Sequence, residues 1–487
     1  MTATTLNSWT APPPARAGLH VPGPLWLWGA LAAMLAMSIT RSITDNGDLT
    51  SSGTMSVAIR TAAPIAMCGL GGLYAERSGT VNIGLEGMMI LGTVFGGWWG
   101  WEFGPWGALV GGVVGGFCGG LLLAIVTTTF GVNHIVAGFA INILAPGVAR
   151  FMSTVLFVDE QGGSLTNSPG VTGDIGEFTM PFMSGGQLFG RETPDVLGRI
   201  DEWNWFAVSD VAGMLKGLTA GVRYDVLVGV GLFAATVFLL WHTRFGLRLR
   251  SAGERPSAAD SLGVRVHLYR YFGASISGAL AGLGGAMLVI SAGRYSQGMT
   301  VGKGFLGLAT LVVGNWRPVG VAIGASIFGF FDGVTQRLSP EELVLALLLA
   351  AALLLFAGTI YAFVTKGASA MRFVAAGVSA FGVFIVLRAF FYELGGSVAV
   401  FLLWLVVGMA ITTAGVVGAV RFGGLSAAIM AMAAVAALFV YLRLDAIPDE
   451  FVPMLPYVVT LVVVSSRGQA LRPPAAAGEP WFKGQQT

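Results

Sequence analysis

Long apolar runs follow one another along almost the whole chain, separated by short stretches that hold most of the charged residues. An apolar run of roughly 17–25 residues is long enough to cross a bilayer as a helix. The pattern predicts about 14 spans. They are 24–40, 55–74, 80–100, 105–129, 133–157, 223–242, 267–291, 303–316, 318–336, 341–363, 373–391, 396–418, 423–442 and 452–466. We therefore predict an all-α, polytopic bundle of transmembrane helices, in which the short run 303–316 is a candidate for a re-entrant segment.

Composition supports this class of protein. Hydrophobic residues make up 55% of the chain and charged residues only 11%, whereas soluble domains are about a quarter charged. The chain is therefore predicted to be an integral membrane protein in contact with lipid, with little room for a soluble domain. Its net charge of +2 gives no indication of nucleic-acid binding. Cys68 and Cys118 both lie in apolar runs, so we expect neither a disulfide nor a metal site.

The uneven distribution of charge orients the spans. The stretch 243–270 is rich in arginine, whereas 158–222 is rich in aspartate and glutamate. Positively charged loops stay in the cytoplasm, so we predict that 243–270 is cytoplasmic and 158–222 extracytoplasmic. An even number of spans then leaves both the N- and the C-terminus cytoplasmic. The first apolar run lacks a convincing signal-peptide cleavage site and is expected to form a membrane helix behind a cytoplasmic tail, 1–23.

A run of glycines indicates close helix packing. In GGVVGGFCGG two rows of glycine repeat at four-residue spacing, which are Gly111, Gly115, Gly119 and Gly112, Gly116, Gly120. Such rows allow the backbone of another helix to approach closely. Glycine has no side chain with which to bind a solute, so we predict a structural role.

The stretch SGTVNIGLEGMM, 78–89, places an amide and a carboxylate inside an apolar region. Asn82 and Glu86 are four residues apart, so both would project from one face of a helix. Ionisable groups within a membrane mark a pathway, a partner or a proton relay. The structural alternative is that Glu86 is hydrogen-bonded or paired with a cation such as Arg60 or Arg77. Three glycines weaken the helix here, and broken helices at membrane depth usually line a cavity.

Between two spans lies the stretch AGERPSAADSLGVRV, 252–266. Pro256 suits the first turn of a helix and Gly263 its end. The residues between them that form an apolar stripe are Ala258, Ala259 and Leu262. A short amphipathic helix of this kind fits a cleft on a partner, or else it rests on lipid.

Other polar residues contribute less. Asn142 precedes Pro146 in an apolar run and is either a helix-to-helix hydrogen bond or a ligand contact. The stretch GMTVGKG, 298–304, resembles a phosphate-binding loop, but its glycine spacing is too short and no Ser or Thr follows Lys303. No arrangement of nucleophile, base or metal ligands indicates an enzyme active site.

Several motifs, taken in order, resemble those of the membrane permeases of bacterial ABC importers, in the family that handles branched-chain amino acids, simple sugars and nucleosides. They are AERSGTVNIGLEGMM (75–89), GERPSAADSLGV (253–264), ISGALAGLGGAML (276–288), GMTVGKGFLGLATLVVGNWRPVG (298–320) and the tail MLPYVVTLVVVSSRGQALRPPAAAGEPW (454–481). The NIGLEG form is most similar to the nucleoside branch.

This resemblance implies that the chain forms half of a solute pathway in the bacterial plasma membrane, with a second permease, identical or related, as the other half. It implies ATPase subunits that hydrolyse ATP and an extracytoplasmic substrate-binding lipoprotein, with no cofactor bound by this chain. The candidates for the translocation path are Asn82, Glu86 and Asn142. The candidates for ATPase coupling are Gly253, Glu254, Ala258, Ala259, Leu262 and Gly263.

Two regions depart from the family's pattern. About four extra spans are expected as an insertion at 341–442, between the permease domain 24–336 and a last span with its tail, 446–487. The outer loop 158–222 is also long. Nucleosides are the first expected solute, and sugars or amino acids are the runner-up. The main rival function is an ATP-independent secondary transporter or channel in which Glu86 binds a proton or an ion.

Overall fold

The structure is a computed structural model that describes residues 34–43, 47–188, 190–338, 349, 352–353, 370–391, 398–421, 425–441 and 471–482. Within these residues, six helices are long and apolar enough to cross a membrane. The chain is thus a mostly helical membrane protein, as its apolar runs predict. The predicted span 452–466 and most of 341–363 lie outside the described residues, so the total of about 14 spans stays a prediction.

The elements follow the predicted spans closely. A helix covers 34–43. The elements after it are η1 Gly47–Thr50, α2 Ser52–Arg77, α3 Leu85–Ala124, the π-helical turn η2 Ile125–Thr129, α4 His134–Leu156, β1 Glu177–Phe178, β2 Gln187–Leu188, β3 Arg191–Glu192, α5 Val196–Glu202, α6 Val208–Thr219, β4 Val222–Arg223, α7 Tyr224–His242, α8 Arg244–Glu254, α9 Pro256–Ser261, α10 Val266–Ala292, α11 Lys303–Val313, α12 Pro318–Thr335, α14 Ala370–Phe391, α15 Val398–Arg421 and α16 Leu425–Tyr441.

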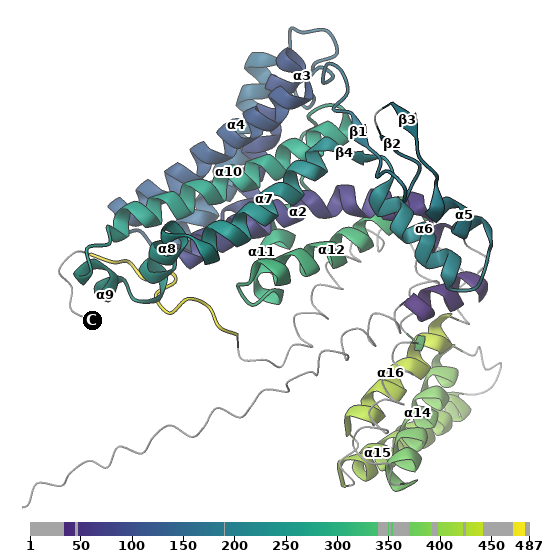
Figure 1. Cartoon of the computed structure of the whole chain (residues 1–487). Coiled ribbons are helices and arrows are strands. Elements are labelled where there is room, and N and C mark those ends of the chain that lie inside the picture. Colours follow the sequence, from purple (N-terminus) through teal and green to yellow (C-terminus); the bar gives the residue numbers. More distant parts are fainter. Residues whose placement is uncertain are drawn as a thin grey trace, which may run out of the picture.

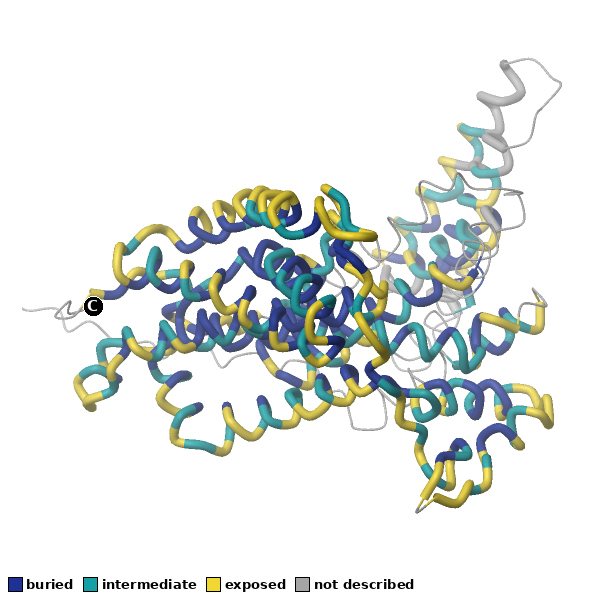
Figure 2. Tube along the Cα trace, turned by 90° about the horizontal axis from the view of Figure 1, so that it is seen from above, coloured by how far each residue is buried: buried dark blue, intermediate teal, exposed yellow. Residues whose placement is uncertain are grey.

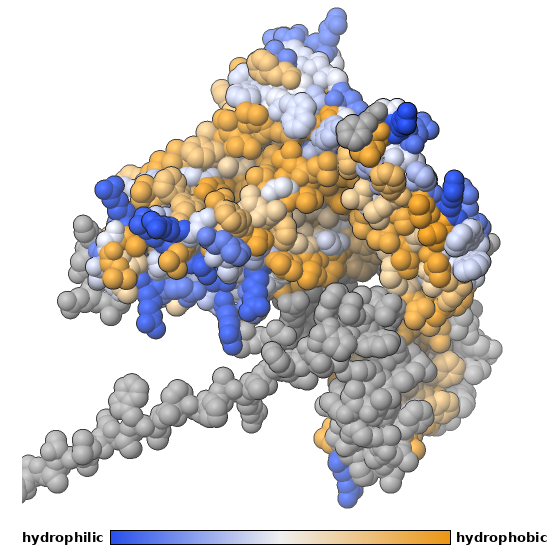
Figure 3. Space-filling view, viewed as in Figure 1, coloured by the Kyte–Doolittle hydropathy of each residue, from blue (hydrophilic) through white to orange (hydrophobic). Residues whose placement is uncertain are grey.

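The long helices run between two ends of the bundle (Figure 1). At one end, here called the α9 end, lie α8, α9 and the last described residues. At the other, the loop end, lie α5, α6 and the short strands of 158–222. The two loops that were predicted to face opposite sides of the membrane therefore do lie at opposite ends. Apolar side chains cover most of the bundle between these ends, and hydrophilic ones gather at the ends (Figure 3).

Helix α3 is a folded hairpin, not one span. With η2 it covers 45 residues, which would be about 68 Å long if straight, more than twice the thickness of a hydrocarbon core. The helix breaks at Gly104, whose φ of 75° and ψ of −173° are non-helical. Beyond the break, the Cβ of a side chain at Gly111 would lie 2.6 Å from the carbonyl oxygen of Phe95 and 2.9 Å from the Cβ of Trp99. The two halves are therefore antiparallel, as predicted from two separate apolar runs.

The second row of glycines packs against α10. A Cβ at Gly116 would lie 2.1 Å from the carbonyl oxygen of Gly278, and one at Gly112 would lie 2.7 Å from that of Gly282. The predicted packing role of both glycine rows is confirmed: one row closes the α3 hairpin, and the other joins it to α10. Figure 2 shows buried residues gathered along the middle of the bundle.

Residues 293–316 cross the bundle instead of re-entering from one side. Gly293 accepts a hydrogen bond from Val171 at the loop end, and Trp316 accepts one from Arg77 at the α9 end. The chain between them first runs without helix and then forms α11, whose 11 residues span about 16 Å. This is half a bilayer, so α11 begins in the middle of the bundle.

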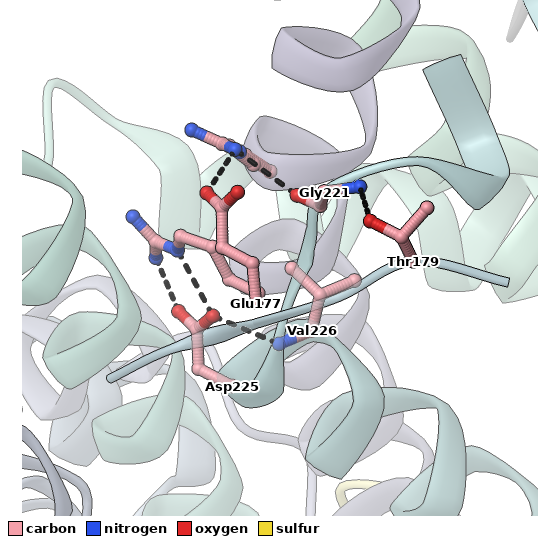
Figure 4. A network of polar contacts seen from close by, with 7 residues as sticks. Glu177, Thr179, Gly221, Asp225 and Val226 are labelled. Atoms are coloured by element: carbon pink, nitrogen blue, oxygen red, sulfur yellow. Dashed lines mark hydrogen bonds and ion pairs between the residues drawn. The ribbon is translucent and has the colours of Figure 1, made fainter. Parts of the chain in front are cut away.

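The long loop 158–222 is fastened to the loop end by polar contacts (Figure 4). Arg60 of α2 donates to Glu177 at 2.7 Å and to the carbonyl of Gly221. Arg223 and Asp225 form a buried ion pair at the start of α7. These charges hold the loop against two long helices.

Helices α14, α15 and α16 belong to the predicted insertion. They pack on one another through small side chains, and their common core is formed by Ala375, Ala376, Ala380, Ala419, Ala428 and Ala431. A Cβ at Gly382 would lie 2.4 Å from the backbone nitrogen of Thr412. The predicted spans 373–391, 396–418 and 423–442 are therefore helical over almost their whole lengths.

We predict that Gly116→Val destabilises the protein by about 1–3 kcal/mol, because the added side chain overlaps the backbone of α10. Thermal unfolding of the purified protein in detergent measures the change. Gly147→Val is the matched control, since that glycine of α4 has nothing within 4 Å of its Cβ position. Equal unfolding temperatures for the two variants would contradict the glycine contact.

We also predict that the attachment of α6 weakens in acid. Burial alone would raise the pKa of Asp210, but hydrogen bonds from Thr50 and Arg41 outweigh it and hold that pKa below its usual range. The stabilisation is then complete above the unfolded-state value of about 3.9 and is lost as the pH falls through the lower folded-state value. Hydrogen exchange of α6 amides should increase over this range in the native protein. In Asp210→Asn the exchange should depend less on pH.

Candidate functional site

The chain loses its helical conformation between α2 and α3, at residues 78–84. Gly79 has a φ of +97°, which is a conformation that side chains other than glycine rarely adopt. Asn82 lies in this break, whereas Glu86 lies in the first turn of α3. The prediction that both side chains project from one face of a helix is therefore wrong, because the helix begins only at Leu85. The expected weakening of the helix by glycine is confirmed.

Asn82 organises the break from within. Its side-chain oxygen accepts a hydrogen bond from the backbone nitrogen of Gly84 at 2.9 Å. Its amide nitrogen donates to the hydroxyl of Ser277 on α10 at 2.8 Å. The side chain is fully buried. Asn82 therefore replaces a helical backbone bond and ties the break to α10.

Asn142 of α4 holds the other side of the break. It donates to the carbonyl of Ile83 at 2.9 Å and accepts from the backbone nitrogen of Gly87 at 2.7 Å. A Cβ at Gly138, one turn earlier on α4, would lie 2.8 Å from the nitrogen of Gly84. Asn142 thus forms the helix-to-helix hydrogen bond that was one of its two predicted roles.

Glu86 holds the start of α11 in the middle of the bundle. Its carboxylate accepts from the Thr300 hydroxyl at 2.6 Å, from the Gly302 nitrogen at 3.1 Å and from the Gly304 nitrogen at 2.8 Å. The first amides of a helix have no intrahelical acceptor, and the helix dipole favours a negative charge there. Glu86, which belongs to α3, supplies both the acceptor and the negative charge to the start of α11.

Neither arginine proposed as a partner of Glu86 binds it. Arg60 binds Glu177 at the loop end, and Arg77 binds Trp316 and Glu254 at the α9 end. Of the two forms of the structural alternative, the structure shows the hydrogen-bonded Glu86 and not the pair with Arg60 or Arg77. Charge counts along the sequence could not reveal a helix N-terminus as its partner.

An ion pair next to Glu86 was not predicted. Lys303 opens α11, and its ammonium group lies 3.1 Å from a carboxylate oxygen of Asp332 on α12. Both side chains are largely buried. The signal was present in the sequence, since each is an isolated charge within an apolar span. Glu86, α11 and α12 are therefore linked by a continuous series of charged and dipolar contacts.

The predicted coupling residues occupy two helices at the α9 end. Gly253 and Glu254 end α8, and α9 begins at Pro256 as expected. Gly263, with a φ of +81°, follows the end of α9, so the predicted stop is also confirmed.

The expected apolar stripe on α9 is divided. Ala259 is 3% exposed and packs with Ala252, Val266 and Trp481, whereas Leu262 is 86% exposed. Ala258 is exposed as well. The prediction of a single apolar face is wrong, because the short helix turns Ala259 inward while Leu262 lies at its free end.

A groove of about 400 Å³ adjoins the exposed residues of α9. Its lining includes Glu254, Arg255, Ala258, Leu262, Val264 and Ala475. Charged and apolar side chains both line it. An exposed leucine beside such a groove is a combination that partner proteins cover.

A family model for the branched-chain amino acid transport system / permease component matches residues 54–358. The chain belongs to this permease family. The match includes the break, Glu86, Asn142, α11 and the α8–α9 region.

The permease is similar to several curated proteins. It is 34% identical over 288 residues to the guanosine ABC transporter permease protein NupQ of Bacillus subtilis (strain 168), covering 56% of this chain and 79% of that protein. It is 32% identical over 281 residues to the nucleoside ABC transporter permease protein NupC of Lactococcus lactis subsp. cremoris (strain MG1363), covering 56% and 78%. It is 29% identical over 308 residues to the putative glucose ABC transporter permease protein TsgC13 of Haloferax volcanii, covering 61% and 80%. No solved structure matches the chain.

We predict that Glu86→Ala loosens the start of α11 and destabilises the permease by about 1–3 kcal/mol, because two backbone amides, one of them buried, and a buried hydroxyl lose their acceptor. Hydrogen exchange of the first turn of α11 and thermal unfolding measure the effect. Glu86→Gln keeps one acceptor oxygen and should lose less. Glu102→Ala is the control, since Glu102 is an exposed glutamate of the same helix. No difference between Glu86→Ala and Glu102→Ala would refute the capping role.

Proposed function

We propose that this permease is a transmembrane subunit of an ATP-binding-cassette importer in the bacterial plasma membrane, with nucleosides as its solute. The observation that carries the proposal is the surface formed by α8, α9 and Leu262. It presents an exposed leucine and a groove at one end of the bundle, in a chain that belongs to a family of transport permeases. A carrier that works without a partner protein does not need such a docking surface.

In this proposal the ATPase subunit docks on α9. Leu262 enters an apolar cleft of the ATPase, while Glu254 and Arg255 form charged contacts at the rim of the groove. Desolvated apolar anchors with a charged rim are typical of protein interfaces. ATP is then hydrolysed by the partner, and this chain binds no cofactor.

The solute proposal rests on the names of the relatives. Two of those compared are nucleoside or guanosine permeases, and a less similar one is a putative glucose permease. Nucleosides are therefore proposed first, with simple sugars second. The α2–α3 break, with Asn82, Glu86 and Asn142, is proposed to border the translocation path, where these residues position the backbone around the solute.

A second permease and an extracytoplasmic binding lipoprotein complete the proposed assembly. Helix α4 exposes a row of large apolar side chains, among them Phe139, Ile143 and Phe151. This row suits either lipid or the second permease. The loop end, with 158–222, is the proposed docking face for the binding protein.

The geometry of Glu86 argues against the rival function of an ATP-independent carrier. Three donors occupy its two carboxylate oxygens. A proton or cation bound at Glu86 would compete with these three bonds, which hold the start of α11. An ATPase at α9 involves no such competition.

Reconstitution tests the proposal. The permease is combined in liposomes with its ATPase, its second permease subunit and its binding protein, and uptake of labelled guanosine and glucose is measured with and without ATP. ATP-dependent uptake of guanosine is expected. Uptake by this chain alone, without ATP, would overturn the importer and favour the carrier.

We predict that Leu262→Asp abolishes ATP-driven uptake while the protein still inserts and folds, because Leu262 is 86% exposed and has little role in the fold. Leu262→Ile is the matched control and should retain uptake. Ala259→Arg is a poorer probe, because Ala259 is buried and a charge there would disturb the α9 end itself. Co-purification of the ATPase measures docking directly, and full ATPase binding by Leu262→Asp would contradict the proposed site.

A further inference from the structure

The C-terminal residues 471–482 lie across the α9 end (Figure 1). Residues 442–470, between α16 and this segment, are not among those that the structure describes. The segment 471–482, here called the strap, has no helix or strand of its own. A segment without regular structure keeps its course only if other elements bind its backbone. The partners of that backbone therefore indicate what the strap does.

The strap binds the α2–α3 break and α8 through two backbone amides. The nitrogen of Gly478 donates to the carbonyl of Gly79 at 3.0 Å, and that of Ala476 donates to the carbonyl of Gly253 at 2.9 Å. Gly79 and Gly253 are themselves in close contact, since a Cβ at Gly253 would lie 2.8 Å from the nitrogen of Gly79. Three backbones from distant parts of the sequence thus meet at one point.

Arg270 of α10 gives the strap an electrostatic role. Its side chain is 1% exposed, and one guanidinium nitrogen donates to the carbonyl of Glu479 at 2.7 Å. The other two nitrogens find no hydrogen-bond acceptor among the described residues. A buried charge without acceptors is costly. Among the described residues, the Glu479 carbonyl of the strap is thus the hydrogen-bond acceptor of the Arg270 guanidinium.

Trp481 anchors the strap between three helices. It is 7% exposed and packs with Ala252 of α8, Ala259 of α9 and Val266 of α10. Its ring centroid lies 4.9 Å from that of His267. Burial of an indole at this junction joins the docking helices to the start of α10.

The strap also reaches the groove and the end of α11. Ala475 lines the groove beside Leu262, and its nitrogen donates to the carboxylate of Glu254 at 3.2 Å. The nitrogen of Arg472 donates to the side chain of Asn315, in the turn between α11 and α12, at 2.9 Å. A partner that fills the groove would therefore touch the strap itself.

We propose that the strap is a coupling element that completes the ATPase-docking surface and makes α8, α9 and the α2–α3 break move together. This inference rests on the proposed importer function. The ATPase subunit displaces α9 and the strap as one body, and the bond from Gly478 to Gly79 carries the displacement to the break. Trp481 and the backbone of 475–479 are positioning groups, and the strap itself touches no solute.

The test compares coupling with activity in the assembled transporter. Trp481→Ala should assemble and hydrolyse ATP, but the solute moved per ATP should fall by about 5-fold or more, the size of a typical coupling between sites. Trp481→Phe should restore most of it. A chain that ends at Phe482 keeps every described strap contact and should behave as the full chain does.

If Trp481→Ala moves as much solute per ATP hydrolysed as the unmodified protein, the coupling role of the strap is wrong, while the importer function stands. Absence of ATP-dependent uptake in the full chain would instead overturn the importer. If Trp481→Ala fails to assemble, hydrogen exchange in the unmodified transporter decides. On binding of a non-hydrolysable ATP analogue, exchange should change in both 471–482 and 78–84. A change in one segment alone, or in neither, contradicts the proposal.

Discussion

The arrangement depends on how the permease satisfies backbone groups that broken helices release inside an apolar bundle. A bilayer interior offers no water to these groups, so each break needs polar partners from the protein. Asn82 and Asn142 serve the break between α2 and α3, and Glu86 serves the free start of α11. The break ends where α3 begins, and Glu86, which binds the start of α11, lies in the first turn of α3. Unwound backbone is therefore concentrated where these three side chains can reach it.

This concentration bears on what the three side chains can do in the proposed importer. Both polar atoms of each amide, and both oxygens of Glu86, already have partners in the fold. A solute bound directly to them would compete with bonds that hold a break together. They are better suited to shape the path than to recognise what passes through it. Groups that select a solute are then expected elsewhere, on surfaces that keep unsatisfied donors and acceptors.

Sequence reasoning succeeded where a property of one segment decides the outcome. Apolar length located α2, α4, α7, α10 and α12, because a helix needs about 20 mostly apolar residues to cross the hydrocarbon core, whatever it packs against. Glycine spacing predicted a close helix contact at 111–120, which α10 makes, but it did not predict which helix would be the partner. Sequence reasoning failed where the conformation or contact of a residue depends on another element of the fold. The start of α3, the acceptor role of Glu86 and the division of Ala259 from Leu262 all depend on elements distant in sequence.

The glycine contact and the strap together constrain how a movement at α9 can spread. Along the interface of α3 with α10, Cβ atoms at Gly116, Gly278 and Gly282 would lie between 2.1 and 2.2 Å from backbone oxygens of the other helix, so the two backbones are in direct contact. These two helices therefore form a closely packed pair. The break precedes α3, and α9 precedes α10, so both attach to the same end of that pair. A force on α9 can therefore reach the break through α10 or, without moving the α3–α10 pair, through α8 and the strap, because Gly253 of α8 touches Gly79 and Gly478 of the strap donates to its carbonyl.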